Sequence, residues 1–252
     1  GTSGEESLSN IRFSEEIGGG LWVWAKPDVS LEEKIENRYV VAVDIGGRGA
    51  KADWSVVVVI DRLNLLDGER PSVVAQWRGH IDHDLLAWKA AQIAKWYDDA
   101  LLVIESNTLE TKDRERSVDG DQSGFILNLV KDTYPNLYAR KRSPEDIREG
   151  APLKYGFHTN TATKPAIISH LQSCVREHLW TERDSRALDE LLCYEQKQNG
   201  SFGAIVGKHD DILMTRAIGL WVALREMELP RIVKNETKKV VATRKVVSAA
   251  TL

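Results

Sequence analysis

The sequence predicts an α/β fold in which helices flank a mixed central sheet. The first observation is the order of the segments, because β-branched apolar runs come early and stretches with helical period come later, mixed with further strands. The second is composition, since 42% of the 252 residues are hydrophobic and 29% are charged, as in ordinary proteins with a buried core. This length suits one large domain or two small ones.

The predicted sheet begins with two apolar runs. Residues 39–43 have the β-branched composition of a buried strand, which Asp44 ends, and residues 55–60 form the second run. Glycines follow Asp44 at once and allow a tight turn, so we predict two antiparallel strands with Asp44 at their mouth. A carboxylate there is costly unless something pairs with it, usually a metal ion. The alternative is that Asp44 caps the glycine turn.

The remaining elements are predicted from shorter signals. Residues 21–24 are interpreted as an edge strand, 72–78 as a third strand, and 101–104, which Glu105 follows, as a fourth. Helical period, together with capping residues or an early proline, predicts the helices. The predicted helices are 84–97, 124–133, 161–179, 185–192 and 212–226, and two further short strands are 136–139 and 193–198.

Acidic residues stand at three comparable places. Asp44 ends the first strand, Glu105 ends the fourth, and Asp210 and Asp211 begin the last long helix. Acids at the ends of adjacent strands and at a neighbouring helix start converge at one sheet edge, and their hard oxygens suit Mg²⁺ or Mn²⁺. Two such ions clamp the attacking and leaving oxygens of a phosphodiester displacement. Singly, each acid is also explained as a surface charge or a helix cap, but two adjacent aspartates exceed what one cap needs.

Four segments of the chain carry a family resemblance. They are Val-Ala-Val-Asp44-Ile-Gly-Gly with Asp53-Trp-Ser after it, Val-Ile-Glu105-Ser-Asn, Gly156-Phe-His-Thr-Asn-Thr-Ala-Thr-Lys164, and Gly207-Lys-His-Asp-Asp211. In order and spacing they resemble the nuclease domain of the large terminase subunit of tailed bacteriophages, over residues 18–224. The resemblance implies an RNase H-like fold and an endonuclease that cuts concatemeric double-stranded DNA during genome packaging.

The resemblance also implies roles for single residues. Asp44, Glu105 and Asp211 would be the catalytic acids and would hold two Mg²⁺ or Mn²⁺ ions, with Asp44 bridging them. Asp210 would be a further metal ligand, and His209 would lie beside the ligands. We favour Asp211 over Asp210 because it directly precedes the apolar part of the helix.

Other residues have two interpretations each. Asp53 either touches a metal ion or a water beside the ligands or is an ordinary turn residue of the hairpin. Lys164 and the basic run Arg140, Lys141 and Arg142 are predicted to contact DNA phosphates, with solvated side chains as the alternative.

The implied partners are those of a packaging motor. They are double-stranded DNA, a packaging ATPase domain in the full-length protein, the small terminase subunit and the portal, all in the cytoplasm of the host cell. The sequence contains no G-x-x-x-x-G-K-[ST] loop, so we predict the nuclease half alone. We place the nuclease domain at residues 38–229, an N-terminal extension with a tag remnant at 1–37, and a basic tail at 230–252.

Charge and composition limit the alternatives. The net charge of −4 argues against a globally basic nucleic-acid-binding protein. No apolar run approaches the ~20 residues of a membrane span, no signal peptide is visible, and the two cysteines match no metal spacing. Two other functions stay open. One is a nucleotide-binding domain of the actin and sugar-kinase type, whose phosphate loop also reads Asp-x-Gly-Gly, and the other is a packaging adaptor without activity.

Overall fold

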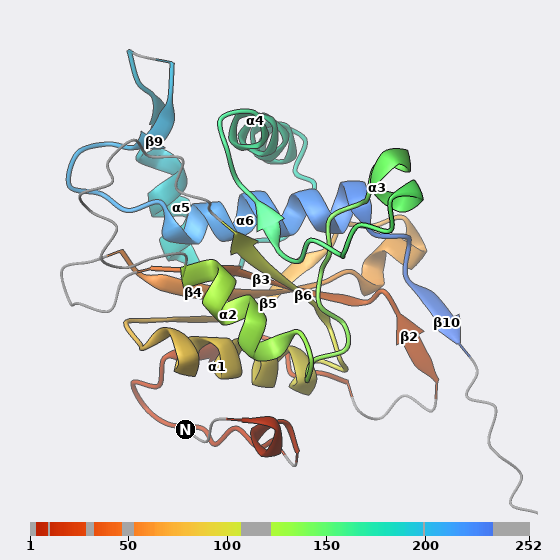
Figure 1. Cartoon of the computed structure of the whole chain (residues 1–252). Coiled ribbons are helices and arrows are strands. Elements are labelled where there is room, and N and C mark those ends of the chain that lie inside the picture. The colour runs from red at the N-terminus through yellow and green to blue at the C-terminus, as the bar shows by residue number, and fades with distance from the viewer. Residues whose placement is uncertain are drawn as a thin grey trace, which may run out of the picture.

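Two helical layers enclose a central sheet (Figure 1). The computed structural model describes residues 4–9, 11–28, 33–46, 53–106, 122–198 and 200–233. One face of the sheet is covered by α1 (His83–Trp96) and α2 (Gln122–Val130). The other face is covered by α4 (Thr163–Arg176) and α6 (Asp211–Trp221).

The sheet has six strands and mixed direction, which confirms the predicted fold class. Its order is β1-β5-β4-β3-β6-β7. The first four strands in this order pair antiparallel, whereas β3, β6 and β7 pair parallel. The strands are β1 (Leu21–Val23), β3 (Tyr39–Asp44), β4 (Ser55–Asp61), β5 (Ser72–Gly79), β6 (Leu101–Ser106) and β7 (Phe157–His158).

The central strands are buried on both faces, which explains their continuous apolar composition. Every residue of β3 is buried. Val41 and Val43 belong to the cluster beneath α1 and α2, whereas Val40 and Ala42 belong to the cluster beneath α4 and α6. Alternate side chains of a strand point to opposite faces, so a strand covered on both sides needs no polar positions.

Helix α6 lies unusually close to the sheet because Gly219 faces it. A Cβ atom on Gly219 would stand 2.9 Å from the Ile60 side chain of β4 and 3.3 Å from Ala42 of β3. The helix is buried along almost its whole length, from Asp211 to Leu220. It then continues as a π-helical segment, Val222–Glu226, rather than as the regular helix predicted to residue 226.

The other elements surround this framework. Two small antiparallel ribbons pair β2 (Lys34–Glu36) with β10 (Arg231–Val233), and β8 (Tyr194–Gln196) with β9 (Phe202–Ala204). The remaining helices are α3 (Pro144–Arg148), α5 (Ser185–Leu192) and the 3₁₀ segments Glu5–Leu8 and Leu63–Asp67. Among the described residues, no helix is both long and apolar enough to cross a membrane.

Parts of the predicted extension and tail join the folded unit. Strand β1 lies within residues 1–37 but pairs with β5 of the central sheet. Strand β10, beyond residue 229, pairs with β2, which itself lies within residues 1–37. The rest of the predicted basic tail, from residue 234, lies outside the described residues. The predicted strand at 136–139 is wrong. Leu137 forms an isolated β-bridge with Leu102, and Ala139 forms another with Tyr155. The segment therefore has no run of paired residues that would make it a strand.

Candidate metal centre

The three predicted acids come from neighbouring elements of the α6 face. Val43 of β3 is in register with Ile104 of β6 in the parallel pair, so the next residues, Asp44 and Glu105, lie beside each other. Each acid comes two residues after a side chain that points toward α6, Ala42 in β3 and Val103 in β6, so both acids face α6 as well. Asp211 is the first residue of α6. All three side chains are buried, with 9%, 8% and 6% exposure for Asp44, Glu105 and Asp211.

The glycine turn after β3 is shaped by a close approach of two backbones. A Cβ atom on Gly46 would stand 2.3 Å from the carbonyl oxygen of Asp53 and from the carbonyl carbon of Trp54, so this position needs glycine. The Gly46 N–H donates to the Ser55 hydroxyl (3.1 Å). Gly47, Gly49 and the rest of the turn up to residue 52 lie outside the described residues.

Asp44 sits in an electrostatically unfavourable place for a carboxylate. Burial raises its pKa well above the ordinary value, and the carboxyl group of Glu105, through its charge and a shared hydrogen bond, raises it further. The charges of Asp211 and Asp210 add to the effect. Asp44 is therefore close to the other candidate ligands, and no positively charged residue is among the causes that shift its pKa.

Glu105 is held by a residue that the sequence did not indicate as functional. The Thr159 hydroxyl, itself buried, donates a hydrogen bond to Oε1 of Glu105. Thr159 directly follows β7, which pairs with the end of β6. It lies within the segment of residues 156–164 that carries the family resemblance, and this was the only sequence signal available for it.

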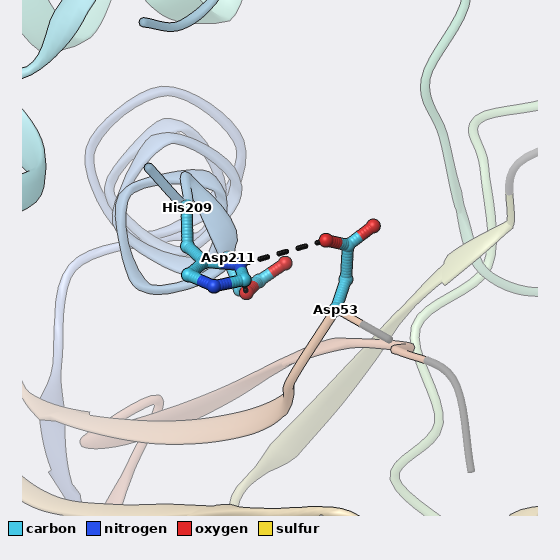
Figure 2. A group of neighbouring side chains, drawn as sticks. All are labelled: Asp53, His209 and Asp211. Carbon is cyan, nitrogen blue, oxygen red and sulfur yellow. Dashed lines mark ion pairs between the residues drawn. The ribbon is translucent and has the colours of Figure 1, made fainter. Parts of the chain in front are cut away.

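Asp211 is held by the backbone beside the glycine turn. The Trp54 N–H donates to Oδ2 of Asp211 (3.1 Å), which opposes the increase in pKa caused by burial. The pKa of Asp211 nevertheless rises to about 6. Figure 2 shows the side chains of His209, Asp211 and Asp53 grouped at the start of α6, and Nδ1 of His209 lies 3.6 Å from a carboxylate oxygen of each aspartate. Ligand atoms of these three residues lie within 4.8 Å of one another, a spacing that a single ion could bridge.

The start of α6 is capped from another helix. Asp210 occupies the N-cap position but makes no side-chain capping bond. Instead, the buried Glu190 of α5 accepts the backbone N–H of Leu213 (2.9 Å). Burial raises the pKa of Glu190 to about 6. Both aspartates at the helix start are thus free of the capping role that was their alternative interpretation.

The residues present suit a divalent cation. In the described part of the chain, no lysine or arginine forms an ion pair with Asp44, Glu105 or Asp211. His209 lies 3.6 Å from a carboxylate oxygen of Asp211, and the charge of Arg78 acts on Asp211 from a greater distance. Buried carboxylates without a cationic partner are costly, and hard oxygen donors are what Mg²⁺ and Mn²⁺ prefer. The imidazole of His209 adds a donor that suits Mn²⁺ better than Mg²⁺.

The predicted DNA-contacting residues lie in two different places. Lys164 is in the first turn of α4, five residues after Thr159, on the side of the acids. Lys141 lines the same cavity as Tyr39 and Leu101, the first residues of β3 and β6. Asp44 and Glu105 lie at the opposite ends of these strands, about 17 Å away along the sheet. The basic run 140–142 is therefore not brought together with the acids.

The strand order, the strand directions and the helices on both faces give the chain an RNase H-like α/β fold. No family model matches the sequence, and no curated protein matches it. Solved structures do match. The large terminase nuclease of the thermophilic phage G20c with bound magnesium is 17% identical with a TM-score of 0.53, covering 85% of this chain and 93% of that chain. The large terminase nuclease domain of Thermus phage P74-26 is 17% identical with a TM-score of 0.50, covering 88% and 95%. The chain thus has the fold of large terminase nuclease domains.

Proposed function

We propose that this chain is the nuclease domain of a large terminase subunit and cleaves double-stranded DNA with the help of divalent cations. The observation that carries the proposal is the convergence of Asp44, Glu105 and Asp211, three buried carboxylates without a lysine or arginine partner among the described residues. The shared fold and the magnesium in the G20c nuclease support it.

The carboxylates would hold two Mg²⁺ or Mn²⁺ ions. Glu105 and the charge of Asp211 both raise the pKa of Asp44, so Asp44 would be the ligand that the two ions share. When bound, such ions generate a nucleophilic water and neutralise charge on the phosphodiester. The chain itself would orient the ligands, because Thr159 fixes Glu105 and the Trp54 N–H fixes Asp211.

The remaining residues would have supporting roles. We favour Asp211 over Asp210 because Asp211 is buried and hydrogen-bonded, whereas Asp210 is half-buried. His209 and Asp53 would adjust the position of the Asp211 carboxylate. Lys164 would contact a DNA phosphate near the site.

The proposed biological setting is that of a phage packaging nuclease. The substrate would be concatemeric phage DNA in the host cytoplasm, cut during genome packaging. The partners would be the packaging ATPase domain of the full-length protein, the small terminase subunit and the portal. The chain contains no phosphate-binding loop of the Walker type, so ATP hydrolysis would belong to the ATPase domain.

A plasmid assay tests the proposal. Supercoiled DNA is incubated with the protein and Mg²⁺ or Mn²⁺, with and without excess EDTA, and we expect nicked and linear products only with free metal. Asp44→Asn should abolish cleavage, and Asp67→Asn, an exposed carboxylate on a surface 3₁₀ segment, is the control. Cleavage in excess EDTA would contradict the proposal. Saturable ATP binding without any DNA cleavage would instead favour the actin and sugar-kinase type.

A further inference from the structure

A cation stands in the same transverse row of the sheet as the carboxylates. Asp44 is paired with Val56 of β4, and Val56 is paired with Arg78 of β5. Residues directly opposite on antiparallel strands point to the same face, so Arg78 shares the α6 face with Asp44. Their backbones are two strands apart, about 10 Å. A phosphate group beside the carboxylates is within the range of a long arginine side chain.

The guanidinium of Arg78 rests against an aromatic ring. Its Cζ lies 4.3 Å from the ring centroid of Trp54, and the ring of His80 lies 3.9 Å from the same ring, centroid to centroid. Trp54 also donates its backbone N–H to Asp211. One residue therefore positions both the arginine and a candidate metal ligand.

The acids near Arg78 do not pair with its guanidinium. Burial lowers the pKa of Arg78, and the charges of Glu190, Asp211 and Asp184 oppose this change. Of these acids, Asp211 is a candidate metal ligand whose carboxylate accepts the Trp54 N–H (3.1 Å). However, Asp184 is already paired with Arg186 (2.9 Å), and Glu190 accepts a backbone N–H of α6 (2.9 Å). The Nε of Arg78 is buried without a hydrogen-bond partner, and in the described ranges no carboxylate forms an ion pair with this side chain. Its donors are available for a ligand.

We propose that Arg78 binds a phosphate of the DNA backbone beside the cleaved bond. The inference rests on the proposed nuclease function and adds a substrate contact to it. The planar guanidinium presents two parallel donors that match two phosphate oxygens, and stacking on Trp54 limits its rotation. A lysine keeps the charge but loses this fork.

The test compares Arg78→Lys and Arg78→Gln with the wild type. Loss of hydrogen bonds to a charged group corresponds to about a ten- to hundred-fold slower single-turnover cleavage in both variants. Binding of a short duplex is measured against salt with Asp44→Asn present throughout, so that nothing is cut. Arg78→Gln should flatten the log–log slope by about 0.9, the value of one phosphate contact, whereas Arg78→Lys should keep it. Arg176→Gln, at an exposed arginine of α4, is the matched control and should cleave normally.

The possible results separate failure of the Arg78 contact from failure of the proposed nuclease function. A wild type that cleaves and an Arg78→Gln variant that cleaves equally fast would overturn the inference and leave the proposed function intact. Loss of the Mn²⁺-induced rise in melting temperature in Arg78→Gln would also overturn it, because the arginine would then act on the carboxylates. A wild type that binds DNA without cleaving it would overturn the proposed function, and the salt slope alone would decide for Arg78. A wild type that does not bind DNA would overturn both.

Discussion

Asp44→Asn separates a metal site from a turn cap. The substitution keeps the shape of the side chain and removes one charge from the cluster of Asp44, Glu105 and Asp211. In the metal-free protein, burial and the neighbouring acids raise the pKa of Asp44. A raised carboxyl pKa means that stability is fully present below the unfolded value near 3.8 and is lost as the pH rises through the folded value. At pH 7.5 the wild type has lost this stability, whereas the Asp44→Asn variant has no carboxyl group there to ionise and keeps it.

The size of the effect is scaled from Asp211. Its pKa of about 6, against an ordinary value of 3.8 for an aspartate, corresponds to at most ~3 kcal/mol at 1.36 kcal/mol per pKa unit. Partial access of water screens such interactions, so we expect Asp44→Asn to stabilise the metal-free protein by about 1–2 kcal/mol. For a chain of this size the melting temperature then rises by about 2–8 °C. The difference from the wild type should vanish below pH 4.

Bound Mn²⁺ should reverse the order of stability of the wild type and Asp44→Asn. A hundred-fold excess of Mn²⁺ over its Kd stabilises the folded wild type by about 2.7 kcal/mol. Asp44→Asn should lose most of this increase, whereas Asp67→Asn should keep it. Thermal unfolding at pH 7.5, with Mn²⁺ and with EDTA, measures both quantities. A variant that is destabilised without metal yet keeps the full Mn²⁺ shift would refute the reasoning, and Asp44 would then be the cap of the glycine turn.

Three further predictions follow from single contacts. Thr159→Val removes the donor to Glu105, so cleavage should slow by about ten-fold or more while the fold is retained, and unchanged single-turnover rates would contradict this role. Gly219→Ala forces a Cβ against Ile60 and should cost about 1–3 kcal/mol in urea unfolding, and an unchanged midpoint would show that α6 moves freely on the sheet. Because protons compete with metal at Asp211, whose pKa is about 6, the Mn²⁺-induced rise in melting temperature should shrink between pH 7.5 and pH 5, and a constant shift would exclude Asp211 as a ligand.

The parts of the fold that follow from local pattern were predictable. The β-branched runs gave β3 and β4, and the strand before Glu105 gave β6. The placement of both acids at one edge then depended only on these strands being neighbours, which the parallel pair of β3 and β6 confirms.

The parts that depend on contacts between distant segments were not predictable. Thr159 meets Glu105 across 54 residues, and Arg78 is level with Asp44 only because of the register of three strands. Glu190 caps α6 from a different helix, so no capping motif appears in the sequence around Asp210. Such contacts arise from tertiary packing and leave no periodic signal in the sequence.

Anomalous diffraction from a crystal soaked in Mn²⁺ tests the central claim most directly. We expect anomalous peaks coordinated by the carboxylates of Asp44, Glu105 and Asp211, and we expect these peaks to be absent from crystals of Asp44→Asn prepared in the same way. Mn²⁺ bound only elsewhere on the wild-type protein, with these three carboxylates left without metal, would contradict it.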